Sequence, residues 1–198
     1  MTTPTLREHK ISTSVDSATY RRSQFMHAIP PTLSAKEDNV QRHLASEHSS
    51  SRSKLRKIYN LMTEIVQVAE PYVACQKGCS ACCKMNVTVS EVEAKYIEAE
   101  KGVKAARLWG SRPHIQNQFI GIPCPFLKED SCSIYDVRPF ACRKHLSFDT
   151  SPYWCEPGRS QEVEMPLIKF EGAENALMII AKANTGGVFA DIRDFFPN

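Results

Sequence analysis

Eight cysteines lie between positions 75 and 155 and are the residues of this chain best suited to chemistry. Cysteine thiolates bind zinc and are the usual ligands of iron–sulfur clusters. The sequence therefore predicts a metal site, and an iron–sulfur cluster is favoured over zinc. All eight are candidate ligands: Cys75, Cys79, Cys82, Cys83, Cys124, Cys132, Cys142 and Cys155.

The first four cysteines follow one another within nine residues, as Cys75-Gln-Lys-Gly-Cys79-Ser-Ala-Cys82-Cys83. Such short spacing lets several thiolates converge on one centre at little cost in loop-closure entropy. Adjacent cysteines, however, direct their side chains apart in most backbone conformations. Cys82 and Cys83 therefore suit a polynuclear centre or two nearby sites better than one mononuclear ion.

The other four cysteines are spaced too widely to form a site by local geometry alone. All four lie in the segment 123–160, which contains five prolines and can hold little regular structure. Metal coordination is the natural way to hold such a segment together. A zinc ion and a cubane cluster each take four ligands, so eight cysteines could serve two centres or one centre with spares.

The cysteines allow two other interpretations. Eight cysteines could form four disulfides in an exported protein, but the first residues lack the apolar core of a secretory signal. We therefore expect a cytoplasmic protein with reduced thiols. One or two cysteines, most plausibly Cys83 or Cys155, could instead be small buried apolar residues.

Basic residues surround the cysteines and could offset the negative charge of metal-bound thiolates. We select Arg138 and Arg143 for this role, although each could equally be a surface charge or pair with a carboxylate such as Asp136. His145 could be a nitrogen ligand. Because enough cysteines are available, a structural or exposed role fits His145 better.

Composition limits the classes of partner. The chain is 42% hydrophobic and 24% charged, as in ordinary globular proteins, and no apolar stretch reaches the roughly 18 residues that a membrane helix needs. The first 60 residues hold ten Lys or Arg against five Asp or Glu, but no nucleic-acid motif accompanies them. We expect a metal ion or cluster as ligand, an unidentified protein partner, and neither membrane nor nucleic acid.

The pattern of apolar residues divides the chain of 198 residues into two parts. Residues 1–52 are rich in Ser and Thr and are expected to form a largely disordered basic arm. Residues 53–198 are expected to form the metal-binding domain, with helices from Ser53 to about Pro71, from Ser90 to about Glu100, and over 173–183. The predicted fold is mainly α with irregular Cys- and Pro-rich loops, a small metal-stabilised α+β single domain.

The cysteine pattern resembles a known family. The first cluster, then Cys124-Pro-Phe-Leu, then Cys132-Ser-Ile-Tyr-Asp-Val-Arg-Pro-Phe-Ala-Cys142-Arg143, then Cys155, are similar to the YkgJ-type cysteine-cluster family of zinc- or iron-chelating proteins. The resemblance covers residues 75–160. It implies metal binding through these cysteines and implies no particular reaction.

Two functions follow from the sequence and this resemblance. The first is a metal-binding protein in which the bound metal holds the Pro-rich fold together. The alternative is an iron–sulfur enzyme of redox or methyl-transfer chemistry that uses S-adenosylmethionine, as implied by a more distant similarity to flagellin lysine methylases. No catalytic residue can be named from the sequence for either function.

Overall fold

The computed structural model describes residues 6–113, 115 and 118–197. Seven α-helices, four 3-10 helices and four short strands occur in these residues. The strands form two separate antiparallel pairs, β1 with β4 and β2 with β3. The fold is therefore mainly α with small sheets and cysteines in loops, as predicted.

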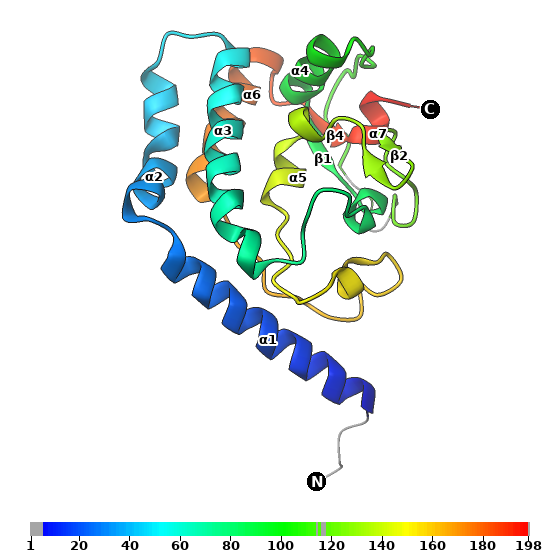
Figure 1. Cartoon of the computed structure of the whole chain (residues 1–198). Coiled ribbons are helices and arrows are strands. Elements are labelled where there is room, and N and C mark those ends of the chain that lie inside the picture. The colour runs from blue at the N-terminus through cyan, green and yellow to red at the C-terminus, as the bar shows by residue number, and fades with distance from the viewer. Residues whose placement is uncertain (1–5, 114, 116–117, 198) are drawn as a thin grey trace.

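One side of the molecule is a helical layer. Helices α2 (Pro31–Ser46) and α3 (Ser51–Ala69) stand side by side and pack against α6 (Glu171–Thr185), while α1 (Leu6–Ala28) crosses the base (Figure 1). Between these helices lies the first core. It contains Phe25, Leu33, Leu44, Leu55, Ile58, Met62, Ile65, Phe148, Leu177 and Ile180, together with other buried residues.

The structure differs from the expectation for residues 1–52. Most of this stretch is helical, in α1 and α2, although residues 1–5 lie outside the described part of the chain. Helix α1 buries little except Ala18 and Phe25, and its Arg21 donates hydrogen bonds to the carbonyls of Tyr72 and Phe148. These contacts are made with distant parts of the chain, so no local apolar pattern predicts them.

The opposite side of the molecule carries the small strands. β1 (Thr88–Ser90) pairs with β4 (Phe189–Asp191), and α4 (Glu91–Lys101) and the short α7 (Ile192–Phe195) flank this pair (Figure 1). A second core fills this side. It contains Val87, Val89, Ala94, Ile97, Leu108, Phe126, Ile134, Val137, Ala190, Ile192, Phe195 and Phe196.

Helix α4 begins and ends as the sequence predicts. Ser90 and Glu93 form a capping box, and Gly102 ends the helix in the left-handed conformation with φ of 66°. The Glu93 carboxylate is buried and accepts hydrogen bonds from the Tyr59 hydroxyl, the Ser90 amide and hydroxyl, and the Phe140 amide. One side chain thus joins α3, α4 and α5 (Phe140–Lys144).

No helix among the described residues is both long and apolar enough to cross a bilayer.

Candidate metal centre

The first cysteine segment follows the 3-10 helix η1 (Glu70–Tyr72) at the end of α3. The Ala74 amide donates to the Ser147 carbonyl at 2.8 Å, and the Ser147 amide donates to the Cys75 sulfur at 3.3 Å. The chain then turns, with the Cys79 amide bonded to the Gln76 carbonyl and Gly78 at φ of 95°. Only glycine adopts that φ readily, so Gly78 permits the tight return to Cys79.

Cys82 and Cys83 lie on the short 3-10 helix η2 (Ala81–Lys84). The Cys124 amide donates to the Cys83 carbonyl at 2.8 Å, so the second cysteine segment starts beside the first. A hairpin of β2 (Leu127–Lys128) and β3 (Ser131–Cys132) follows, with Cys132 opposite Leu127. Its two turn residues have positive φ, the geometry of a type I′ turn, which returns Cys132 toward Cys124.

The last two cysteines come from other elements. Cys142 lies on α5, and Cys155 ends the 3-10 helix η4 (Pro152–Cys155), which packs against η2. Trp154 is buried, which fixes η4 to the rest of the molecule. All eight cysteines are free thiols and none is exposed, so the interpretation as four disulfides is wrong for this structure.

Burial raises the pKa of most of these thiols. It raises the pKa of Cys124 to about 11 and raises the pKa of Cys75, Cys132, Cys142 and Cys155 as well. A metal-free site would therefore hold mostly neutral thiols, whereas a bound cation would favour the thiolates.

The adjacent pair behaves differently because its members hydrogen-bond to each other. This bond raises the pKa of Cys82 and lowers the pKa of Cys83, and Arg193, Arg138 and Lys84 lower the pKa of Cys83 further. Cys83 is thus the thiol most ready to ionise. The cations needed to balance a negative centre are already in place.

The two arginines predicted to accompany the cysteines have different roles. The Arg138 guanidinium favours the thiolate forms of four cysteines, and its Nε is buried with no hydrogen-bond partner in the described part of the chain. Arg143 is buried and donates to the carbonyls of Asp136 and Arg138 and to the Thr63 hydroxyl. Arg143 therefore holds the backbone before α5 rather than facing the sulfurs.

His145 lies beside the cysteines. Burial lowers the pKa of its ring, and its carbonyl lies 3.7 Å from the Cys75 sulfur. The residue lines a cavity of about 340 Å³, which Cys82 and Cys142 also line. The other lining residues are apolar except Asn86. The cavity gives a small molecule space directly beside two sulfurs.

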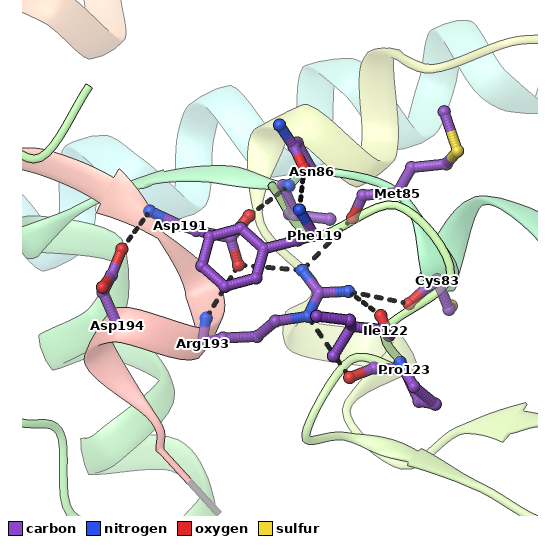
Figure 2. A network of polar contacts seen from close by, with 10 residues as sticks. Cys83, Met85, Asn86, Phe119, Ile122, Pro123, Asp191, Arg193 and Asp194 are labelled. Atoms are coloured by element: carbon purple, nitrogen blue, oxygen red, sulfur yellow. Dashed lines mark hydrogen bonds and ion pairs between the residues drawn. The ribbon is translucent and has the colours of Figure 1, made fainter. Parts of the chain in front are cut away.

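Arg193, which no sequence pattern identifies as part of the site, holds the cysteine loops together from the C-terminal end of the chain (Figure 2). The guanidinium is 8% exposed and pairs with fully buried Asp191 at 2.8 Å. It donates to the carbonyls of Cys83, Met85, Ile122 and Pro123, as Figure 2 shows. The only local signal is the Asp191–Asp194 capping box of α7, which predicts a helix start and no contact with cysteines.

The donors fit a sulfur-liganded centre, although they do not form a tight cage. Among the residues that the structure describes, no three His, Cys, Asp or Glu side chains are grouped closely enough to hold one ion as they stand. The thiols nevertheless lie near enough to perturb one another's pKa, and the unpartnered Arg138 Nε could donate to a thiolate or sulfide. Both observations suit a centre with sulfur ligands and negative charge.

Comparison with known proteins gives one match. A family model named CxxCxxCC and described as "Putative zinc- or iron-chelating domain" matches residues 74–156. No curated protein and no solved structure gives a significant match to this chain. The matched residues include all eight cysteines, which supports metal binding by this segment.

Proposed function

We propose that the eight cysteines bind iron as an iron–sulfur centre, a proposal supported by the match of residues 74–156 to the model of a zinc- or iron-chelating domain. The main support is the set of free thiols in one segment, beside Arg138, whose buried Nε has no hydrogen-bond partner in the described residues. The predicted ligands are Cys75, Cys79, Cys82, Cys83, Cys124, Cys132, Cys142 and Cys155. Such a centre would supply electron-transfer or Lewis-acid chemistry when bound.

The adjacency of Cys82 and Cys83 favours iron–sulfur over zinc. Both residues lie on η2, and each is partly buried among other sulfurs. A single tetrahedral zinc ion would require four sulfurs about 2.3 Å from one point. A cluster offers several metal atoms, each at a different position, so two neighbouring thiolates can each bind a different metal atom.

The test is anaerobic purification of the full chain, followed by iron, acid-labile sulfide and zinc analysis and a visible spectrum. We expect iron, sulfide and a brown chromophore. Cys79→Ser should lower the metal content, whereas Ser80→Ala, one residue away and without a thiol, should leave it unchanged. Colourless protein holding zinc would refute the iron–sulfur proposal, and protein without metal would refute metal binding by these cysteines.

The cavity favours one second candidate, an iron–sulfur enzyme that uses S-adenosylmethionine. About 340 Å³ lies within the usual range for small-molecule sites, and Cys82 and Cys142 form part of the wall. Adding S-adenosylmethionine to the iron-loaded protein should then perturb the visible spectrum. An unchanged spectrum would favour the metal-binding protein without this activity.

A further inference from the structure

A second cavity, which we call the outer cavity, adjoins the one that Cys82 and Cys142 line. Its volume is about 560 Å³, within the usual range for small-molecule sites. Residues of α5 and α6, of β1 and β4, and of the segment 167–169 form most of its wall. The two cavities share Asn86, Ala141 and His145. The outer cavity therefore ends next to the space beside the two sulfurs.

Half of the residues that line the outer cavity are apolar, among them Phe140, Leu177 and Phe189. Two other apolar residues of this wall, Leu167 and Met178, are 55% and 40% exposed. A hydrocarbon body in the cavity would cover both side chains, and removing apolar surface from water is favourable. The wall therefore suits a ligand that is mainly apolar.

Most charges of the wall are already balanced within the protein. Lys144 pairs with Glu174 at 3.2 Å. The buried Glu93 carboxylate accepts four hydrogen bonds, one of them from the Tyr59 hydroxyl. The buried Arg143 guanidinium lies 4.3 Å from the centroid of the Tyr59 ring, so a cation also lies near this carboxylate. None of these groups needs a ligand for charge balance.

Lys169 is the remaining charged residue of the wall. Its side chain is exposed, and it makes no ion pair with the described part of the chain. It follows Leu167 and Ile168, so the cation and the apolar surface belong to the same segment. One unbalanced positive charge beside an apolar wall complements a ligand with one negative charge and a hydrocarbon body. An anion at this exposed position also keeps part of its hydration.

We propose that the outer cavity binds an apolar carboxylic acid. Its carboxylate lies at Lys169, and its hydrocarbon body covers Leu167 and Met178. The inner end of the body then lies near Asn86 and His145, where the cavity beside the sulfurs begins. This site needs no metal, so the proposal goes beyond the iron–sulfur proposal and does not depend on it.

The first test is calorimetric titration of the full wild-type chain with octanoate, octylamine and butyrate. Octanoate should bind at least about tenfold more tightly than octylamine, which has the same length and the opposite charge at pH 7. It should also bind at least about tenfold more tightly than butyrate, which lacks four methylene groups. No binding of octanoate, or equal binding of octylamine, would overturn the proposal.

Two matched pairs of variants locate the site. Lys169→Met should weaken octanoate binding about threefold to fivefold, whereas Lys182→Met, an exposed lysine of α6 outside the cavity wall, should stay within about twofold. Met178→Glu should weaken binding at least about tenfold. Its neighbour Ile179 is 37% exposed and does not line the cavity, so Ile179→Glu should stay within about twofold. Equal effects within either pair would overturn the proposed position.

Two controls separate this proposal from other causes. Circular dichroism checks that each variant keeps its helices, and the comparison of ligands on wild-type protein needs no variant. Metal is measured on the same preparations. Metal-loaded protein that does not bind octanoate overturns only the carboxylic-acid site. Protein that binds octanoate without holding metal supports this site and overturns the proposed function.

Discussion

Replacing Arg193 with Met should destabilise the protein more than any other single arginine substitution on the strand side. Met keeps an apolar stem of similar length but removes the guanidinium. Asp191 would then be a fully buried carboxylate without its cation, and four backbone carbonyls would lose donors. The two loops that carry Cys83 and Cys124 would lose the side chain that joins them (Figure 2).

The size of the effect follows from the burial of the pair. Removing one partner of a buried ion pair costs about 3–5 kcal/mol, whereas an exposed pair contributes about 1 kcal/mol or less. Arg193 is 8% exposed and Asp191 0%. With a urea dependence of about 2 kcal/mol per M, the midpoint of unfolding should fall by about 2 M.

Arg112 provides the matched control. It pairs with Asp194 of the same C-terminal segment at 2.9 Å, but its side chain is 60% exposed. Arg112→Met should therefore lower the urea midpoint by less than about 0.5 M. Both variants are compared with wild type by circular dichroism in urea, on metal-loaded protein. Equal midpoints for Arg193→Met and Arg112→Met would refute the fastening role of Arg193.

Three further predictions concern the packing of the helices. Glu93→Gln should lower the free energy of unfolding by about 2–3 kcal/mol, because an amide NH₂ would face N–H and O–H donors. The control Glu91→Gln, whose ion pair with a lysine reaches solvent, should lower it by less than about 1 kcal/mol. Equal losses of stability for the two variants in urea unfolding would contradict this prediction. Gly172→Ala should lower the free energy of unfolding by about 1–3 kcal/mol in thermal melts, because its Cβ would lie 1.9 Å from the Glu37 carbonyl oxygen. In the control Gly158→Ala the Cβ meets nothing within 4 Å, so stability should change by less than about 0.5 kcal/mol. Unchanged stability of Gly172→Ala would show that α2 and α6 are not closely packed there. Burial raises the pKa of Glu37, so ionised Glu37 is penalised only in the folded protein. Glu37→Gln should therefore stabilise the protein at pH 7, and this advantage should shrink as the pH falls and Glu37 of the wild type becomes protonated. A difference in urea midpoint that stays constant with pH would refute the assignment.

Local patterns in the sequence predicted the elements that local interactions form. The helix from Ser53, the capping box of Ser90 and Glu93, and the helix ending before Gly186 are confirmed as α3, α4 and α6. Each has an apolar period or a cap within a few residues, so the signal lies in the segment itself.

The elements that escaped prediction depend on distant contacts. Helix α1 has few buried residues, and its Arg21 bonds to carbonyls 51 and 127 residues away. Arg193 bonds to the Cys83 carbonyl, 110 residues earlier. The cysteine pattern identified the kind of donor but could not assign donors to centres, because the hairpin and η4 that group the thiols come from widely separated positions.

The position of Arg193 along the chain has a consequence for synthesis. A ribosome adds about 5–20 residues per second, and Arg193 follows Cys83 by 110 residues. The loop that carries Cys83 is therefore made roughly 5 to 20 seconds before the side chain that holds it in place. During that interval the thiols of the nascent chain are accessible to oxidants and to the source of the metal. The folded metal site can be completed only after Arg193 has been translated.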